Sequence, residues 1–335
     1  MTMKNFCISW IAIYASIIYC YFISKNIKPG NIRLISLLPI ITLFTLIPLN
    51  LFSSPNLCGI TAFFISCLAN FKLFAFAFDK GPLSSSPISL IQFTSIASLP
   101  IKIKQSQGSK TVSLKSPLNY TIKFLLFAIV LRLYAYRSHL HHNIILTIYC
   151  LHVYLSLEII LALFAAPARA LLKIEIEPQF DEPYLSTSLQ DFWGRRWNLM
   201  VSGVLRSSVY EPVRLVLERV MRKRWSSAFA MMATFVVSGL VHELMYYYLT
   251  RAKPTWEVSW FFVVHGMCTA VEVLVKKSKF GEKLKLNRVV SGVLTIGFVT
   301  VTSFWLFFPQ LVRNGVDLRA IEELGFAISS NDRLY

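Results

Sequence analysis

The chain has few charged residues for its length. Of its 335 residues, only 15% are Asp, Glu, Lys or Arg, while 55% are hydrophobic. Soluble domains carry roughly 25% charged residues, so this composition excludes an ordinary soluble domain. Eight apolar stretches approach or exceed the roughly 20 residues that a membrane-spanning helix needs. They comprise residues 6–24, 32–52, 57–78, 118–136, 144–166, 229–249, 256–275 and 289–311.

Acidic residues are scarcer than basic ones. The chain has 17 Asp and Glu against 34 Lys and Arg, a net charge of +17. On a soluble domain this excess would indicate nucleic-acid binding. Here the basic residues lie between apolar stretches, so we exclude a nucleic-acid partner. With a lumenal N-terminus, 24 of the 34 basic residues fall in cytosolic loops, as the positive-inside rule requires. These loops are 25–33, 79–117, 167–228 and 276–288.

Motifs for metal binding, disulfides and transport are missing. The six cysteines are scattered and form no CxxC pair, which is typical of small apolar core residues. His139, His141 and His142 cluster in one short loop, but no second histidine box accompanies them, so we predict no metal site. No internal repeat of the kind found in secondary transporters is visible.

Ionisable side chains inside apolar stretches are costly, so each is a candidate functional residue. His242 and Glu243 lie near the middle of 229–249, and Ser238 lies one helical turn before His242 on the same face. Gly239 leaves room for a close helix neighbour. A neutral imidazole can take the proton from a hydroxyl that attacks a carbonyl. Because no GxSxG nucleophile motif is present, direct attack on a thioester is the simplest chemistry for His242.

Other ionisable residues in the apolar stretches have more than one interpretation. His152 and His265 are either hydrogen-bond partners between helices or functional groups. Lys72, Lys123 and Arg132 lie nearer the ends of their stretches. We expect their stems to extend along the helices and carry the charges to the membrane surface.

Residues 189–200, LQDFWGRRWNLM, are predicted to form a helix in the least apolar part of the chain. Ser188 followed by Asp191 is a typical helix start. At helical spacing Asp191, Arg195 and Asn198 share one face, and Asp191 with Arg195 is a favourable pair.

Two tryptophans, Trp193 and Trp197, share another face of this predicted helix. One interpretation is a surface anchor with an aromatic belt, and the other is the cytosolic lip of a site. A shorter apolar segment, 88–101, is predicted to lie at the interface or to be re-entrant.

Two motifs carry a resemblance to a known family. SLQDFWGRRWNLMVSGVLR at 188–206 and FVVSGLVHELMYYYLTR at 235–251 resemble the plant wax synthase group of the membrane-bound O-acyltransferase superfamily. That group also includes plant acyl-CoA:sterol acyltransferases. The stretches 58–84, 177–190 and 261–272 are similar as well, so the resemblance extends over nearly the whole chain.

The resemblance implies an all-α, multi-pass protein of the endoplasmic reticulum membrane. It implies a single domain over residues 1–335, with helices around a tunnel and with no metal or other cofactor. Its partners would be the lipid bilayer, acyl-CoA from the cytosol and a lipid alcohol, and association with further copies of the chain stays open. The family's intramembrane histidine falls on His242, and the asparagine of its tryptophan-rich motif falls on Asn198.

We therefore expect an acyltransferase that makes wax esters. His242 would act as the base and Asn198 would steady developing charge, with support from Glu243, Asp191, Trp197 and Ser238. Basic residues on the cytosolic side would meet the CoA phosphates, although the positive-inside rule explains them equally well; they are Arg195, Arg196, Arg206, Lys276 and Lys277. A sterol acyltransferase and a transporter with a His/Glu relay are the alternatives.

Overall fold

The computed structural model describes residues 2–51, 53–84, 89–102, 117–172, 176–276, 278 and 287–325. Within these ranges, eight helical segments are long and apolar enough to cross a membrane, which confirms the expected number. They are Phe6–Ile23, Asn31–Leu51, Pro55–Ala77, Pro117–His139, His142–Ala170, Lys223–Thr250, Glu257–Lys276 and Arg288–Arg313.

Several of these segments join more than one kind of helix. The N-terminal half contains α1 (Thr2–Asn26), α2 (Asn31–Leu46), η1 (Ile47–Leu51), α3 (Pro55–Thr61), η2 (Ala62–Ala69), α4 (Asn70–Ala77), α5 (Leu90–Ser98), α6 (Pro117–Leu133), η3 (Tyr134–His139) and α7 (His142–Leu172). The C-terminal half contains η4 (Pro183–Leu185), α8 (Leu189–Asp191), η5 (Phe192–Arg196), α9 (Leu199–Leu205), η6 (Arg206–Tyr210), α10 (Glu211–Leu217), α11 (Lys223–Thr250), α12 (Glu257–Lys276), α13 (Arg288–Thr302), η7 (Ser303–Phe307), α14 (Pro309–Arg313) and α15 (Val316–Glu323). The segments η2, η5, η6 and η7 are π-helical.

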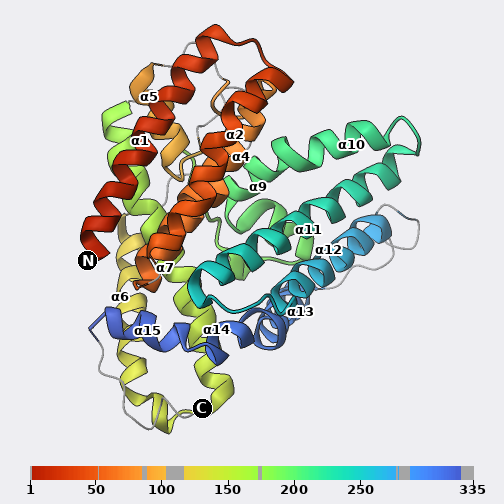
Figure 1. Ribbon diagram of the computed structural model, residues 1–335. Helices are drawn as coiled ribbons and strands as arrows, with labels where there is room; N and C mark the ends of the chain where they lie inside the picture. The colour runs from red at the N-terminus through yellow and green to blue at the C-terminus, as the bar shows by residue number, and fades with distance from the viewer. Residues whose placement is uncertain are drawn as a thin grey trace.

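The helices form two groups with different directions (Figure 1). In one group α1, α2, α4 and α5 lie together, and their apolar core includes Ile13, Leu37, Phe44 and Phe64. In the other group α10, α11 and α12 extend away from the first, while α14 and α15 cross below α11 in the view. The apolar core of the first group also includes residues from α7, such as Leu161.

The helices α11 and α12 pack closely because two glycines lie at their contact. A Cβ atom on Gly239 would lie 3.0 Å from the Cα atom of Ser259, and one on Gly266 would lie 2.8 Å from Cβ of Phe235. No side chain fits in such spaces without movement of the neighbour. The expectation that Gly239 admits a close helix neighbour is thus confirmed. The helix α12 packs directly against the face of α11 that contains Gly239.

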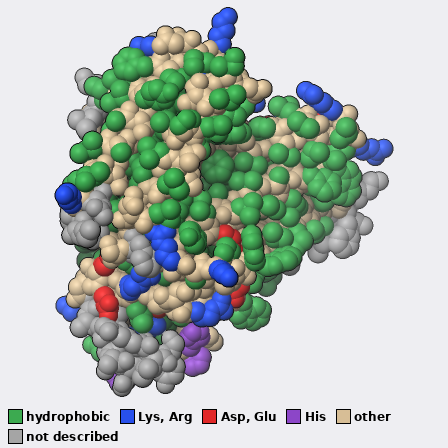
Figure 2. Space-filling view, viewed as in Figure 1, with side chains coloured by type: hydrophobic (Ala, Val, Ile, Leu, Met, Phe, Trp, Pro, Cys, Tyr) green, Lys and Arg blue, Asp and Glu red, His purple; other side chains and the backbone are tan. Residues whose placement is uncertain are grey.

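Large apolar side chains cover the outer surface. On α13 and η7, Val289, Val293, Leu294 and Trp305 are exposed. Figure 2 shows hydrophobic side chains over both groups of helices, with a hollow between them. In water such patches would be unstable, whereas lipid tails cover them without cost. The surface therefore agrees with the composition in indicating a multi-pass membrane protein.

Buried lysines overturn one expectation. The side chain of Lys72 is fully buried, and its Nζ donates to the carbonyl oxygens of Ile96 (2.6 Å) and Leu99 (2.7 Å) at the end of α5. Lys123 is 4% exposed and pairs with Glu158. Neither reaches the membrane surface, because each finds acceptors inside the protein.

The structure also bears on the segment 88–101, on Arg132 and on the cysteines. The segment 88–101 contains the short helix α5, which begins with a Ser89 and Gln92 capping box. Arg132 is exposed. All six cysteines are free, and Cys20, Cys58 and Cys67 are buried.

Candidate active site

A large cavity lies between the two groups of helices. Its volume is about 920 Å³, within the range of sites that enclose small-molecule ligands. Its walls come from α7, α9, α11 and α12 and from the π-helical segments, and most of its lining is apolar or aromatic. Trp197, Asn198, Ser238 and His242 all line it. Residues far apart in the sequence are thus brought to one chamber.

The hydrogen bond of His242 fixes where its proton is. Nδ1 lies 2.7 Å from the carbonyl oxygen of Ser238. Because a carbonyl oxygen only accepts, Nδ1 carries the hydrogen and donates it. Nε2 then holds a free lone pair, and it has no hydrogen-bond partner within the described ranges. The ring lies against Phe262, with centroids 4.3 Å apart. His242 therefore presents a proton acceptor within an apolar cavity.

Glu243, the next residue of α11, contacts α12 and not the cavity. Its carboxylate is 5% exposed and accepts the backbone N–H of Ser259 (3.3 Å), in the first turn of α12. It does not line the cavity. The contact fastens α12, which carries Phe262, against α11. Ser238 holds His242 through its backbone carbonyl, while its side chain lines the cavity.

The segment 189–200 is not the continuous helix that the sequence predicted. The Ser188 side chain does begin it, accepting the backbone N–H of Asp191 (3.2 Å). The chain then widens into the π-helical η5 and breaks at Trp197 and Asn198. Asn198 adopts a left-handed conformation (φ 40°) and begins α9 as its cap. Asparagine tolerates this conformation better than most residues.

The π-helical turn also changes the predicted ion pair. Asp191 Oδ2 binds Nε of Arg196 at 2.8 Å, and Arg195 is exposed. The expected pairing of Asp191 with Arg195 is wrong, because a π turn brings together residues five apart where an α turn brings together residues four apart. The predicted shared face of Asp191, Arg195 and Asn198 is lost with the helix.

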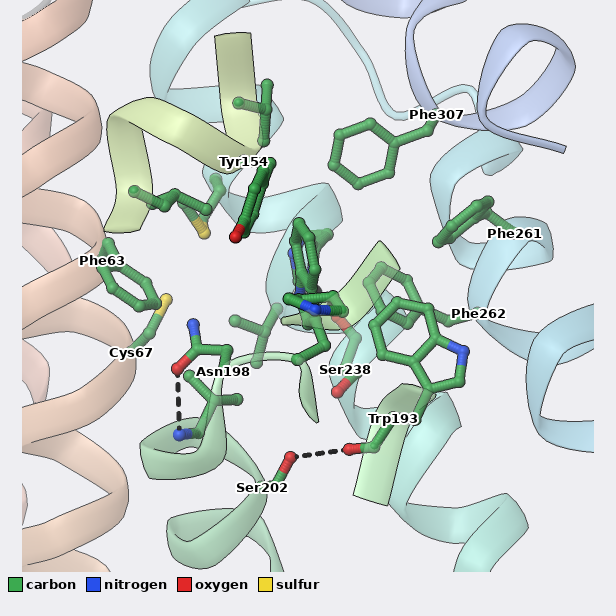
Figure 3. A pocket seen from close by; sticks show the side chains of 18 of the residues that line it. Phe63, Cys67, Tyr154, Trp193, Asn198, Ser202, Ser238, Phe261, Phe262 and Phe307 are labelled. Atoms are coloured by element: carbon green, nitrogen blue, oxygen red, sulfur yellow. Dashed lines mark hydrogen bonds between the residues drawn. The ribbon is translucent and has the colours of Figure 1, made fainter. Parts of the chain in front are cut away.

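The position of the Asn198 amide follows from its role as a cap. Oδ1 accepts the backbone N–H of Val201 (3.3 Å), so the oxygen is directed toward α9. Figure 3 shows the nitrogen pointing the other way, into the cavity near Phe63 and Tyr154. Asn198 is 6% exposed. Its NH₂ group is thus a fixed donor on the cavity wall.

The two tryptophans both line the cavity, although Trp197 lies beyond the end of η5 and the helix face predicted for them does not form. Trp197 stacks on Phe192 (centroids 5.4 Å apart, 16° between planes). Trp193 donates its indole N–H to Nδ1 of His265 (3.1 Å), whose Nε2 then donates to Thr302 Oγ1 (2.8 Å). Both ring nitrogens of His265 are used, so it is a hydrogen-bond partner between helices.

The remaining histidines differ from His242. Nδ1 of His152 lies 3.0 Å from the hydroxyl of Tyr134. A hydroxyl both donates and accepts, so this bond leaves the tautomer of His152 open. Within the described ranges, which include the cluster His139, His141 and His142, no group of three or more His, Cys, Asp or Glu side chains is arranged to hold a metal.

Every π-helical segment in the described ranges contributes to the cavity wall. Phe63, Trp193, Tyr210 and Phe307 line it from η2, η5, η6 and η7. Such segments occur often at functional sites. Of these four residues only Trp193 could be singled out from the sequence, because nothing in the helical periodicity marks a π turn. Their aromatic side chains were the available signal.

A second, smaller pocket adjoins the cavity and is strongly basic. Its volume is about 310 Å³. It shares Gln190 and Arg195 with the large cavity. The full lining is Thr187, Ser188, Gln190, Asp191, Arg195, Arg196, Lys276 and Arg288. Four cations and one carboxylate line it; Asp191 pairs with Arg196, and Lys276 pairs with Glu272.

The predicted basic contacts fall in three places. Arg195, Arg196 and Lys276 meet in the basic pocket, together with Arg288, which the sequence analysis did not single out. Arg206 lines the large cavity instead. Lys277 lies outside the described residues.

These features define a polytopic membrane protein with an internal cavity, a histidine within an apolar span and an adjoining basic pocket. Residues 176–264, which contain both Asn198 and His242, match the membrane bound O-acyl transferase family. The chain is 50% identical to a long-chain-alcohol O-fatty-acyltransferase of Simmondsia chinensis, over 96% of this chain and 93% of that protein. It is 45% identical to an acyl-CoA–sterol O-acyltransferase of Arabidopsis thaliana, over 96% and 94% of the two chains.

A third relative, a probable long-chain-alcohol O-fatty-acyltransferase of Arabidopsis thaliana, is 47% identical over 97% of this chain and 96% of its own. The chain belongs to the membrane bound O-acyl transferase family and is an acyltransferase. The resemblance found in its two motifs is thereby confirmed.

Proposed function

We propose that this protein transfers a fatty acyl group from acyl-CoA to the hydroxyl of a long-chain alcohol, releasing CoA and a wax ester. The observation that carries the proposal is that His242 lines a large apolar cavity beside a basic pocket while its Nδ1–H bond to Ser238 leaves Nε2 as a proton acceptor. Similarity to long-chain-alcohol O-fatty-acyltransferases supports the choice of acceptor. We place the protein in the endoplasmic reticulum membrane, acting without a metal or other cofactor.

The reaction proceeds by direct attack. Nε2 of His242 takes the alcohol proton as the oxygen bonds to the thioester carbonyl carbon. The Asn198 NH₂ group donates to the carbonyl oxygen as negative charge develops there, an effect that is typically about 3–4 kcal/mol for a positioned donor. The carbon–sulfur bond then breaks, and the imidazolium returns the proton to the leaving thiolate. No proton is gained or lost overall.

The basic pocket holds the phosphates of CoA. Its cations, Arg195, Arg196, Lys276 and Arg288, provide charge-assisted hydrogen bonds to phosphate oxygens. Gln190 and Arg195 line both the basic pocket and the large cavity. The pantetheine arm therefore passes from the pocket into the cavity at these two residues and brings the thioester with it. The apolar walls keep water from competing with the alcohol.

The acceptor is tested by the ester that forms. The full chain is expressed in cells that lack neutral-lipid synthesis, which are fed either fatty alcohol or sterol. Wax esters from the fatty alcohol, at a rate well above that of steryl esters, are the expected result. Steryl esters alone would assign the chain the activity named for its Arabidopsis thaliana sterol relative. Purified protein that makes neither ester from acyl-CoA would return the transporter with a His/Glu relay to consideration.

A further inference from the structure

A short segment fixes the backbone on both sides of Asn198. Residues 177–182, here called the strap, lie beside the break between η5 and α9. The N–H of Asp181 donates to the carbonyl of Arg196, which precedes Trp197 (2.9 Å). The N–H of Leu199, which follows Asn198, donates to the carbonyl of Gln179 (2.7 Å). The two bonds bracket Trp197 and Asn198. The position of the strap therefore sets the position of the Asn198 amide.

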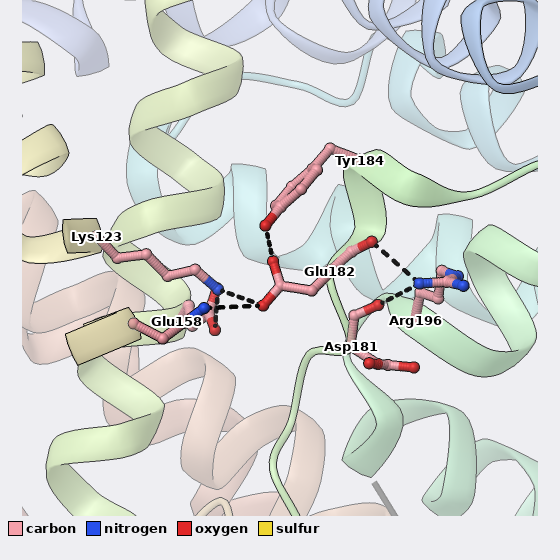
Figure 4. A network of polar contacts seen from close by, with 7 residues as sticks. Lys123, Glu158, Asp181, Glu182, Tyr184 and Arg196 are labelled. Carbon is pink, nitrogen blue, oxygen red and sulfur yellow. Dashed lines mark hydrogen bonds and ion pairs between the residues drawn. The ribbon is translucent and has the colours of Figure 1, made fainter. Parts of the chain in front are cut away.

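The strap is itself held by a buried ionic cluster (Figure 4). Nζ of Lys123 lies 2.8 Å from the carboxylate of Glu158 and 3.2 Å from that of Glu182, at the end of the strap. The Lys123 and Glu158 side chains are 6% and 5% exposed, and that of Glu182 is 18% exposed. Removing one partner of a buried ion pair is strongly destabilising, because it leaves the other charge buried and unpaired. The cluster ties the strap to α6 and α7.

Two further observations show that the strap is under constraint. Glu182 adopts a left-handed conformation (φ 46°), which a non-glycine residue rarely holds without support from its surroundings. From the other side, Nη1 of Arg196 donates to the carbonyls of Asp181 (3.0 Å) and Glu182 (3.4 Å). The strap thus spans from the ionic cluster in α6 and α7 to the π-helical turn η5.

We propose that Lys123, Glu158 and Glu182 form an ionic clamp that positions Asn198 for acyl transfer. None of the three lines the large cavity, so they are positioning residues that act through the strap. The inference rests on the role given to Asn198 in the proposed function. Misplacing a reacting group by about 1 Å can lower a rate by about 10²-fold, so loosening the clamp lowers kcat even when the fold survives.

The test is a double-mutant cycle on the purified full chain, with ester formation measured at saturating acyl-CoA and alcohol. Glu182→Gln weakens the clamp, and Asn198→Asp keeps the oxygen that caps α9 while removing the NH₂ donor. Each single variant is expected to lower kcat by about 10- to 100-fold. The double variant is expected to be no slower than Asn198→Asp alone, because the clamp acts through the group already lost.

A matched control comes from the same strap. Glu177 pairs with Lys102 at 2.7 Å, and the two side chains are 10% and 36% exposed. This pair lies at the other end of the strap and includes none of the three clamp residues, so Glu177→Gln should leave kcat unchanged. If Glu182→Gln does not accumulate, Glu182→Asp replaces it. That variant keeps the charge but draws the carboxylate away from Lys123. Its smaller loss of kcat should also disappear when it is combined with Asn198→Asp.

Each outcome separates the clamp from the proposed function. Losses that multiply in the double variant would overturn the clamp and leave the role of Asn198 standing, as would a Glu182→Gln enzyme with normal kcat. Normal kcat in Asn198→Asp would overturn the role of Asn198 and the clamp together.

Discussion

The three intramembrane histidines differ in how their hydrogen bonds are made. His242 gives its Nδ1 hydrogen to a carbonyl, which leaves Nε2 as an acceptor. His265 uses both nitrogens, and His152 meets a hydroxyl. Their places inside apolar spans could be predicted from the sequence for all three. Their roles could not, because the partners Thr302 and Tyr134 are set by packing between helices.

Arg288 provides a test of the basic pocket at the scale of one residue. It is exposed, and it lines the pocket beside Lys276. A hydrogen bond from a charged group contributes about 1.5–3 kcal/mol, so Arg288→Ala should raise KM for acyl-CoA by about tenfold or more. The value of kcat should stay unchanged, because Arg288 is distant from the reacting atoms. Steady-state kinetics with acyl-CoA as the varied substrate measure both.

The control is Arg219→Ala, which removes an equally exposed arginine that lines neither pocket. An equal rise in KM for both variants would show only a general effect of surface charge. It would contradict the assignment of the pocket to the CoA phosphates.

Among the helices, the break at Asn198 shows what periodicity can and cannot predict. The helix start at Ser188 was predicted correctly, whereas the helix face predicted for the two tryptophans does not form, although both line the cavity. The π turn and the left-handed Asn198 were missed, because they depend on bonds to the strap, about 17 residues earlier in the chain. Local patterns do not contain that information.

The contact between α11 and α12 provides a test at the scale of an element. A methyl group on Gly239 would lie 3.0 Å from the Ser259 backbone, and crowding of this kind costs about 1–3 kcal/mol. Gly239→Ala should therefore lower the thermal unfolding temperature of the purified protein. Gly297→Ala is the control, since nothing lies within 4 Å of its Cβ position. Equal thermal stability of the two variants would contradict the close packing.

For the molecule as a whole, the eight spans could be predicted from the lengths of the apolar stretches alone. The burial of Lys72 and Lys123 could not. Their partners lie on other elements, and Glu182 is 59 residues from Lys123 in the chain. The cavity could be expected only through the family resemblance, because its walls come from segments spread along the chain.

Orientation in the membrane is tested by glycosylation. Asn119-Tyr120-Thr121 has the form of a glycosylation site, and a lumenal N-terminus places it on the cytosolic side. It should therefore carry no glycan, whereas a site engineered into a lengthened 138–142 loop should be modified. A mobility shift after glycosidase treatment reports both results. A glycan on Asn119 of the natural chain would reverse the orientation.

The most direct test of the account is the activity of His242→Ala with acyl-CoA and fatty alcohol in detergent. Loss of a general base lowers rates by about 10²–10⁴-fold, so the rate of ester formation should fall by at least about 10²-fold. Acyl-CoA binding should stay normal, because the imidazole acts on the alcohol. His265→Ala, whose histidine lies outside the cavity lining, should lose activity only in step with lost folded protein, and His152→Ala, whose histidine lines the cavity, should lose less activity than His242→Ala. Ester formation by His242→Ala at the rate of those two variants would contradict the assignment of His242 as the base.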